Sequence, residues 1–370
     1  MAKADDNSGK IAALRIRLLA WYRQHARDLP WRQCSDPYGI WVSEIMLQQT
    51  RVAVVVDRYQ KFMSRFPTPI ALALAPEQSV LAMWSGLGYY RRARMLHKAA
   101  QFVAEHYGGN LPSRADKLRL LPGIGAYTAA AVASIAHGEP VAVVDGNVER
   151  VLCRFAGWEA GSRKGGGAAL RRKIQDLAGV LLDPARPGDW NQAIMELGAT
   201  VCAPRNPLCS ACPLQPDCKT RGEHKTPRRP TMMSREVAYA LSVRIMAASG
   251  ERQVPRAREV LLEQRPAHHT VMPGMWELPA LAASDVPPEQ VLMTLRHAIM
   301  QVNYYVRIRN VFEPDVEAVT VLGGERRWVP LSEAAEMALS GLARKVLTRA
   351  RLLPPATVDS VAPGAQEDAS

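Results

Sequence analysis

Four cysteines form the first candidate site for chemistry in this sequence. Cys202, Cys209, Cys212 and Cys218 follow the spacing C-x6-C-x2-C-x5-C, and the prolines among them predict a loop. Four thiolates on a loop bind either one zinc ion or one 4Fe–4S cluster. Zinc sites usually combine two separate C-x2-C pairs, but only one occurs here. The spacing therefore favours the cluster over zinc, and over two disulfides.

The elements around this loop come from a chain of 370 residues, a length that predicts two domains. A predicted helix near 190–201 leads directly into the cysteine loop. The remaining cysteines, Cys34 and Cys153, are expected to be buried as small apolar residues.

The charge of the chain indicates its class of partner. The net charge is +12, which indicates a polyanion, most simply nucleic acid. The N-terminus is polar, and no apolar run is long enough to span a membrane. We therefore expect a cytoplasmic protein without a membrane anchor.

A lone carboxylate is the second candidate. Glu44 lies within an apolar stretch that follows Asp36 and Pro37, a residue pair typical of a helix start. Burying a carboxylate is costly unless it is paired or functional. The alternative is a helix end whose polar residues face solvent.

A helix-hairpin-helix signature occupies residues 117–136. Gly123 and Gly125 lie between two predicted helices, where successive backbone N–H groups can bind a DNA phosphate. Asp145 follows shortly afterwards and has the position of a helix N-cap. Tyr89, beside Gly88 and several arginines, suits a wedge at a base step, with a solvated basic face as the alternative.

The pattern changes after a basic, proline-containing linker at 219–235. Two strands joined as a hairpin, a helix near 288–297, a strand near 302–312 and a closing capped helix predict a separate α+β domain.

Together these motifs resemble the endonuclease III superfamily of DNA glycosylases across residues 10–220. LPWR, WVSEIMLQQT, GLGYYRRAR, VDGNVERV and WNQAIMELG are similar to the MutY-type adenine DNA glycosylases. GMWELP is similar to their Nudix-like domain. The resemblance implies a glycosylase domain at 1–218. Its six-helix barrel spans about 28–140, and its cluster domain is built from 1–27 and 141–218. A Nudix-like recognition domain at 236–352 and a disordered tail at 353–370 follow.

The resemblance also implies the reaction. The enzyme flips adenine, mispaired with 8-oxoguanine or guanine, out of double-stranded DNA and hydrolyses its glycosidic bond. Glu44 is the acid that protonates adenine, Asp145 stabilises the cationic sugar, and Asn147 supports Asp145. Tyr127 replaces the lysine of the lyases, which implies a monofunctional enzyme. Separately from the resemblance, a monomer is the default expectation, and the expected location is the cytoplasm, in association with the nucleoid.

Further positions carry over from the family. Arg27, Trp31, Arg32 and Gln192 match residues of the adenine pocket. Gln49 and Tyr89 match residues that fill or wedge the opened stack, and Gly123 and Gly125 match the DNA-binding hairpin. The four cysteines match the ligands of the 4Fe–4S cluster.

One stretch departs from the family. Leu295, Arg296 and His297 appear where relatives carry a Phe-Ser-His loop that reads 8-oxoguanine, with His297 retained for DNA contact. This change predicts weaker discrimination between 8-oxoguanine and guanine. Two alternatives remain for the whole protein: a lyase acting on oxidised pyrimidines, and a non-catalytic iron–sulfur DNA-binding protein.

Overall fold

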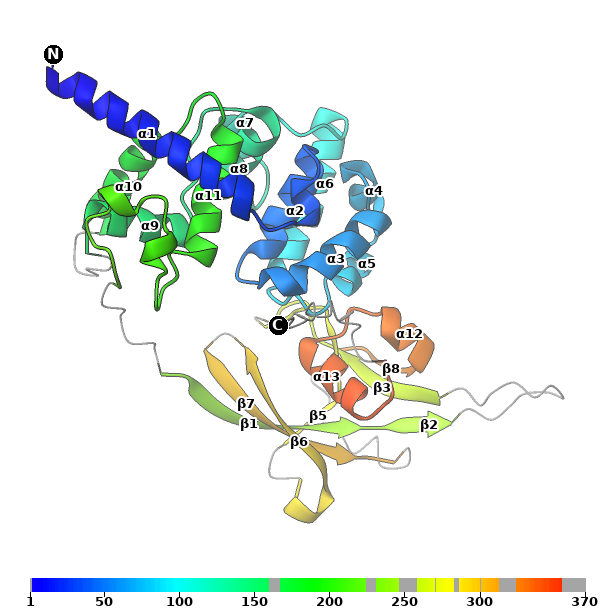
Figure 1. The fold of residues 1–370 in the computed structure, drawn as a ribbon. Helices are drawn as coiled ribbons and strands as arrows, with labels where there is room; N and C mark the ends of the chain where they lie inside the picture. The colour runs from blue at the N-terminus through cyan, green and yellow to red at the C-terminus, as the bar shows by residue number, and fades with distance from the viewer. Residues whose placement is uncertain are drawn as a thin grey trace, which may run out of the picture. The chain divides into compact units, whose positions relative to one another are not determined.

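A computed structural model describes residues 2–159, 167–223, 231–245, 258–269, 271–282, 286–299, 301–312 and 324–354. The chain forms two compact units (Figure 1). The first unit contains Met1–Ala75 and Arg92–Arg229, and the second contains Pro76–Arg91 and Pro230–Ser370.

The first unit is helical. Its helices are α1 (Ala2–His25), α2 (Pro37–Leu47), α3 (Val52–Arg65), α4 (Pro69–Leu74), α6 (Arg91–Tyr107, whose first residue belongs to the second unit), α7 (Ala115–Leu118), α8 (Ala126–His137), α9 (Gly146–Ala156), α10 (Gly167–Leu181) and α11 (Pro187–Thr200), with the short 3-10 helix η1 (Pro30–Arg32) before α2. Helix α11 contacts α1, α8 and α9, while α8 also contacts α2. One apolar core joins α1, α9, α10 and α11 through residues such as Leu18, Leu152 and Leu197.

Local signals explain the helix ends that matter for the site. Asp36 caps α2 by accepting hydrogen bonds from the backbone N–H groups of Tyr38 and Gly39, at 3.1 and 3.0 Å. Helix α8 is rich in alanine, which allows α2 and α11 to approach it closely, and it ends at Gly138 in the left-handed region.

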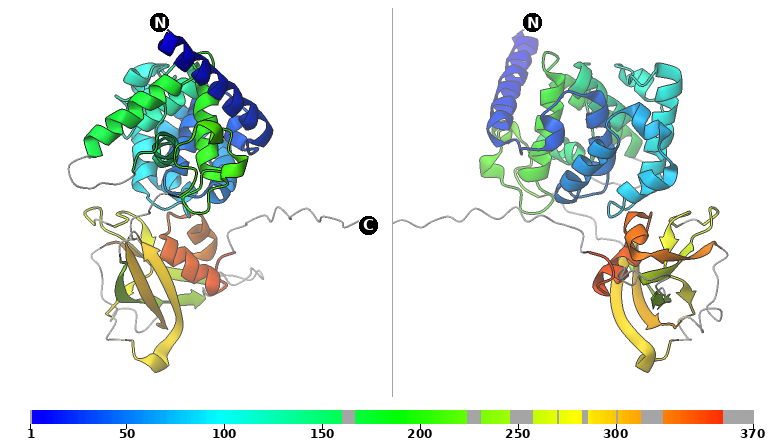
Figure 2. Two further views of the ribbon diagram at one scale, coloured as in Figure 1. Left: turned by 60° about the vertical axis from the view of Figure 1, so that its left-hand side comes forward. Right: turned by 90° about the vertical axis from the view of Figure 1, so that its right-hand side faces the viewer.

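The second unit contains two sheets and short helices (Figure 2). The first sheet has the order β5-β1-β7-β6, formed by β5 (Ala280–Leu281), β1 (Met233–Leu241), β7 (Val302–Asn310) and β6 (Val291–Ile299). In the second sheet β3 (Arg258–Gln264) pairs with β2 (Val243–Ile245), β4 (Trp276–Glu277) and β8 (Arg326–Pro330). Helices α5 (Glu77–Met83), α12 (Leu331–Glu336) and α13 (Gly341–Arg349) complete the unit.

The predicted order, a mainly helical region followed by an α+β region, is confirmed. The helix predicted near 288–297 is wrong. Residues Pro288–Gln290 form a 3-10 turn, and β6 follows in antiparallel register with β7. Apolar residues at 291, 292, 295, 298 and 299 fit a helical period equally well, so pairing with β7 decides the conformation.

Two further expectations concern single segments. Cys153 is buried as predicted, but Cys34 is exposed, because it lies in the loop between η1 and α2. In the predicted tail, Leu353 packs into the core of the second unit, and residues 355–370 lie outside the described ranges.

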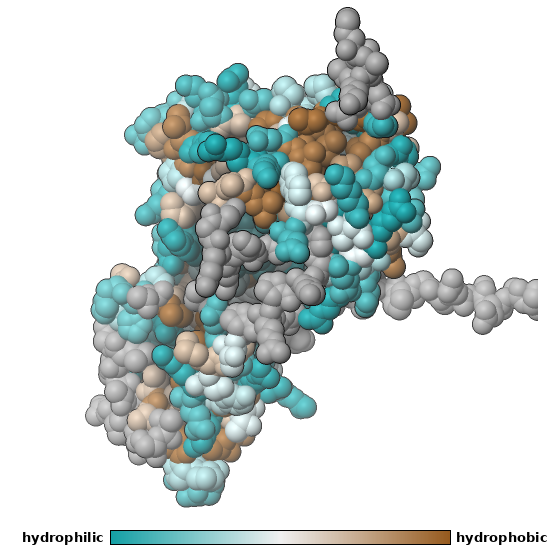
Figure 3. Space-filling model, turned by 90° about the vertical axis from the view of Figure 1, so that its left-hand side faces the viewer, coloured by the Kyte–Doolittle hydropathy of each residue, from teal (hydrophilic) through white to brown (hydrophobic). Residues whose placement is uncertain are grey.

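The surface mixes polar and apolar areas, as the face in Figure 3 shows. Exposed apolar side chains of the first unit include Ile16, Leu74, Leu120 and Val180. None of the helices in the described ranges is both long and apolar enough to cross a membrane.

Candidate active site

A cavity of about 740 Å³ opens in the first unit. Helices α2, α8, α9 and α11, together with η1 and the turn after α2, contribute its walls. The cavity brings together nine of the residues predicted from sequence: Glu44, Tyr127, Asp145, Asn147, Arg27, Trp31, Arg32, Gln192 and Gln49.

Glu44 projects from the buried helix α2 and is 6% exposed. Its Oε2 atom accepts a 2.6 Å hydrogen bond from the hydroxyl of Tyr127. Burial raises the pKa of Glu44 to about 7; the Tyr127 bond opposes this rise, and the charge of Asp145 adds to it. Near neutral pH the carboxyl group can therefore both donate and accept a proton.

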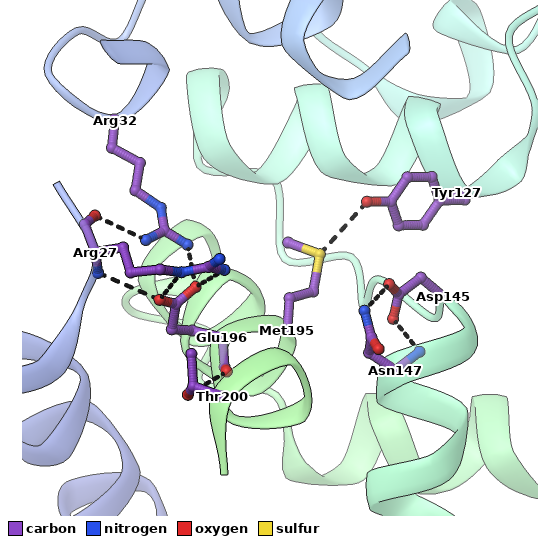
Figure 4. A network of polar contacts seen from close by, with 8 residues as sticks. All are labelled: Arg27, Arg32, Tyr127, Asp145, Asn147, Met195, Glu196 and Thr200. Atoms are coloured by element: carbon purple, nitrogen blue, oxygen red, sulfur yellow. Dashed lines mark hydrogen bonds and ion pairs between the residues drawn. The ribbon is translucent and has the colours of Figure 1, made fainter. Parts of the chain in front are cut away.

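Tyr127 is the second residue of α8, directly after the glycine hairpin. Burial and the neighbouring Glu44 raise the pKa of Tyr127 well above its ordinary value, so the phenol stays neutral and can donate a hydrogen bond. Its hydroxyl also lies 3.5 Å from the sulfur of Met195 (Figure 4).

Asp145 is the N-cap of α9, as its position in the sequence predicts. Its Oδ1 accepts from the backbone N–H groups of Asn147 and Val148 at 2.9 and 2.7 Å, and its Oδ2 accepts from Asn147 Nδ2 at 3.1 Å. The cap therefore also presents a fixed carboxylate to the cavity, so the N-cap and functional interpretations are compatible.

Asn147 is held in turn by Arg150, which donates to Asn147 Oδ1 at 3.0 Å. The same guanidinium group donates to the carbonyls of Gly198 and Cys202, at 2.6 and 2.9 Å. Arg150 lines the cavity and was missed by the sequence analysis, although it lies three residues after Asn147 on the same helix.

The most important missed residue is Glu196 on α11, which is 1% exposed. Arg27 donates to both of its oxygens at 2.6 and 2.8 Å, and Arg32 donates at 2.8 Å (Figure 4). Although burial opposes ionisation, the two guanidinium groups lower the pKa of Glu196 to about 2. A glutamate four residues after Gln192, among apolar neighbours, was the signal that could have identified it.

Three further predicted residues, Trp31, Gln192 and Gln49, line other parts of the same cavity. Trp31 is 7% exposed and packs edge-on against Tyr59, with 5.3 Å between ring centroids. Gln192 lies on the cavity wall one turn before Glu196. Gln49 is exposed at the turn after α2 and has a left-handed backbone, with φ of 58°.

The remaining predicted positions lie outside the cavity. Gly123, at φ 76°, turns the hairpin between α7 and α8, where a Cβ atom would lie 2.6 Å from Met95 Cβ. Gly125 is the N-cap of α8. Tyr89 and His297 belong to the second unit.

Within the second unit, Leu295, Arg296 and His297, which match the Phe-Ser-His stretch of the family, lie inside strand β6. Arg296 donates to Asn303 Oδ1 on β7, at 2.9 and 3.1 Å. The half-buried His297 faces Gly341 at the start of α13. Strand β6 pairs with β7 up to Ile299, opposite Val302, and Met300 lies outside the described ranges.

The four cysteines Cys202, Cys209, Cys212 and Cys218 line one small cavity of about 30 Å³. Two 3-10 turns shape their loop, and Arg154 donates to the carbonyls of Ala203 and Pro204 at 2.7 and 2.9 Å. Arg154 Nη1 also lies 3.4 Å from Cys202 Sγ, so its guanidinium group can balance the negative charge of a thiolate at this position. Four thiols around one cavity are the donor type that an iron–sulfur cluster takes. As the described residues are placed, no group of three or more histidine, cysteine, aspartate or glutamate side chains is arranged to hold a metal ion.

Comparison with known proteins finds similarity to DNA repair proteins. Residues 42–175 match the model of the HhH-GPD superfamily base excision DNA repair proteins. The adenine DNA glycosylase of Homo sapiens is 48% identical over 221 residues, covering 57% of this chain and 40% of the relative. The adenine DNA glycosylase of Mycobacterium tuberculosis is 43% identical over 198 residues, covering 53% of this chain and 64% of the relative.

A thermostable thymine-DNA glycosylase has a similar structure, with a TM-score of 0.53 and 30% identity over 58% of this chain and 98% of that chain. The resemblance to adenine DNA glycosylases inferred from the motifs is confirmed by these curated relatives. The chain spans 40% of the length of the human relative and 64% of the length of the mycobacterial one. The chain belongs to the HhH-GPD superfamily of base excision DNA repair proteins.

Proposed function

We propose that the protein is a monofunctional DNA glycosylase that hydrolyses the glycosidic bond of adenine mispaired with 8-oxoguanine or guanine. The observation that carries this proposal is the pairing of two carboxyl groups in one cavity. Glu44 has a pKa of about 7, and Asp145 is fixed as a helix cap beside it. The adenine DNA glycosylases among the relatives support the choice of base.

The two carboxyl groups have separate roles. Protonated Glu44 donates its proton to N7 of the extruded adenine, and the C1′–N9 bond breaks with its electron pair moving to the base. Asp145, held by Asn147 and the α9 backbone, stabilises the positive charge on the sugar. Water then adds to C1′, and its proton returns to Glu44.

The opposite side of the cavity binds the base. Arg27, Arg32 and Glu196 form a preorganised charged cluster, and Trp31 and Gln192 lie on the same wall. Because these groups already bond one another, they need little reorganisation when a polar base enters.

Cleavage of the DNA strand is not expected. A lyase of this kind needs an amine that forms an imine with the sugar. Tyr127 occupies the position at which the resembled lyases carry lysine, and no lysine is present among the described residues that line the cavity.

DNA binding would use the hairpin and the turn after α2. The glycines Gly123 and Gly125 place backbone N–H groups at the start of α8 for a phosphate, and Gln49 and Tyr89 would fill or wedge the opened stack. The proposed fold is a six-helix barrel with a cluster domain, followed by a Nudix-like domain that recognises the strand opposite adenine.

The cysteine loop is proposed to hold a 4Fe–4S cluster through Cys202, Cys209, Cys212 and Cys218. When bound, the cluster would supply iron–thiolate bonds that cross-link the loop. Iron and sulfide analysis of the purified protein tests this assignment, and one zinc per chain would contradict it.

A single-turnover assay tests the function. Duplexes with adenine opposite 8-oxoguanine, guanine or thymine are incubated with excess protein and read with and without alkali. Strand breaks that appear only after alkali, and only for the mispaired duplexes, are the expected result. Breaks without alkali would indicate a lyase, and no adenine release with the cluster intact would indicate a binding protein.

The replacement of Phe-Ser-His by Leu295, Arg296 and His297 leads us to propose weaker preference for 8-oxoguanine over guanine. The ratio of the two single-turnover rates measures this preference. A ratio equal to that of an enzyme with Phe-Ser-His would contradict the proposal.

A further inference from the structure

Arg92 of α6 contacts both the end of α2 and the turn that follows it. Its Nη1 atom donates to the carbonyls of Ile45 and Met46, both at 2.8 Å. Its Nη2 atom donates to the hydroxyl of Thr50 at 3.0 Å. One half-buried arginine side chain therefore joins two adjacent segments that both line the cavity, and Thr50 is itself one of the lining residues.

The carbonyls of Ile45 and Met46 belong to the last turn of α2, where no further helical N–H is available. A cation at this end also interacts favourably with the helix dipole. Arg92 consequently caps the helix that carries Glu44.

The turn after α2 has an unfavourable backbone. Gln49 is not glycine, yet its φ is 58°, a conformation that persists only when the surroundings impose it. On one side of Gln49, Gln48 donates to Thr128 on α8 at 3.4 Å. On the other side, Thr50 is held by Arg92, so both neighbours of the strained residue are anchored.

We propose that Arg92 is a positioning residue for base extrusion: it holds Gln49 in the conformation that enters the opened base stack. This inference rests on the proposed function. Gln49 is exposed and lines the cavity mouth, so its placement affects how readily adenine leaves the duplex. Glu44 keeps its separate bond to Tyr127, so protonation of the base does not depend on Arg92.

The geometry requires an arginine. The planar guanidinium fork donates from two terminal nitrogens in different directions, toward the helix end and toward Thr50. A lysine ammonium has the same charge but offers one nitrogen, which cannot reach both segments in the same arrangement. The substitution Arg92→Lys therefore separates charge from geometry. Thr50→Val removes the contact of Arg92 with the turn, together with the 3.5 Å bond from the Thr50 hydroxyl to the carbonyl of Gln48, and leaves the bonds to the helix end in place.

Extrusion is measured in a Glu44→Gln background, where chemistry is blocked, by the stopped-flow fluorescence of 2-aminopurine placed at the adenine position. Saturating protein removes differences in affinity. Arg92→Lys is expected to reduce the extrusion equilibrium about tenfold, the low end for lost hydrogen bonds to a charged group. Thr50→Val is expected to reduce it about threefold, as for an ordinary hydrogen bond, because Arg92 keeps its bonds to the helix end. The control Lys98→Ala, on the exposed side of α6, is expected to change nothing.

A second readout separates positioning of Gln49 from positioning of the acid. With Glu44 present, the pH at which the single-turnover rate falls should be the same in Arg92→Lys and in the unsubstituted protein. A shifted pH profile with normal extrusion would overturn the proposal, because Arg92 would then act through Glu44. Unchanged extrusion in Thr50→Val and Arg92→Lys would also overturn it, and if Arg92→Lys does not fold, Thr50→Val decides.

Failure of the proposed function gives a different pattern. If the unsubstituted protein extrudes 2-aminopurine but releases no adenine, the glycosylase proposal fails. The extrusion measurements then still test whether Arg92 positions Gln49. If it extrudes no base at all, the role of Arg92 is overturned as well.

Discussion

Glu44 and Glu196 line the same cavity and are both almost fully buried, at 6% and 1% exposed, yet their protonation differs. On one side, Glu44 has a neutral tyrosine as its hydrogen-bond partner, and its pKa rises to about 7. On the other side, two arginines bind Glu196, and its pKa falls to about 2. Met195 lies between Tyr127, the partner of Glu44, and the cluster of Glu196 with its two arginines (Figure 4).

The difference shows that burial alone does not determine what a carboxyl group does. Desolvation raises the pKa of both groups, and the partner then decides the outcome. A hydrogen bond from tyrosine is too weak to offset burial, so Glu44 can hold a proton for catalysis. Two guanidinium groups more than offset it, so Glu196 remains an anion that organises the pocket.

The largest expected effect tests the Glu44 side. Glu44→Gln keeps the shape and can still accept from Tyr127, but it has no proton to donate, so adenine release should fall about 1,000-fold. Single-turnover rates measure the loss. The control is Glu149→Gln, the same change at an exposed position of α9, which should retain full activity.

The substitution Glu44→Gln should also change how the free energy of unfolding depends on pH. The pKa of Glu44 in the folded protein is raised above the unfolded value, so its contribution to stability is lost as pH rises from 4.5 through about 7. Glu44→Gln should therefore gain stability relative to the unsubstituted protein over that range. A constant difference in urea unfolding between pH 4.5 and 8 would contradict the raised pKa.

The Glu196 side should respond in the opposite way. Glu196→Gln leaves Arg27 and Arg32 without a counter-charge and should cost about 2 kcal/mol at pH 7, below the value for fully buried pairs because Arg27 is 39% exposed. The depressed pKa means that this contribution is present above pH 4.5 and is lost as pH falls toward about 2.

Urea unfolding of both proteins at several pH values checks this prediction. The difference between them should shrink continuously as pH falls from 4.5 toward 2. Equal stability at pH 7 would mean that the arginine contacts contribute nothing net.

The pH profile of the reaction tests how far the hydrogen bond from Tyr127 opposes the rise that burial causes in the pKa of Glu44. Adenine release should decline as pH rises through about 7, because the acid form of Glu44 is consumed. Tyr127→Phe removes a hydrogen bond that stabilises the carboxylate, so the decline should move to higher pH. Single-turnover rates across the pH range measure it, and movement to lower pH would refute this account of Glu44.

The smallest expected effect concerns the geometry of the arginine cluster. Arg27→Lys retains the charge but loses the two-point contact with Glu196, and should cost about 0.5–1 kcal/mol because the site is part-exposed. Thermal unfolding measures this loss. A cost as large as that of Glu196→Gln would show that contact geometry, and not charge balance, dominates on this side of the cavity.

Much of the site could be predicted from the sequence because its signals are local. Asp36 with Pro37 and Asp145 with Asn147 are capping patterns read from adjacent residues, and both place a helix start where the structure has it. The glycine hairpin before α8 and the proline-rich spacing of the cysteine loop also depend on short-range stereochemistry. The same motifs correctly indicated the family.

The errors and omissions have the opposite character. Residues 291–299 fit both a helix and a strand, and only their antiparallel pairing with β7, the next strand in the chain, selects the strand. Cys34 is exposed because of the path of a loop, and the roles of Glu196 and Arg92 depend on partners 169 and about 45 residues away in the chain.

The sequence by itself therefore determined the helix starts and turns near the site, because capping and turn preferences act within a few residues. It also supplied the set of side chains that we propose for glycosidic chemistry. Only the tertiary structure decided which carboxylate keeps its proton. That choice depends on burial and on whether a tyrosine or two arginines meet the group across the cavity.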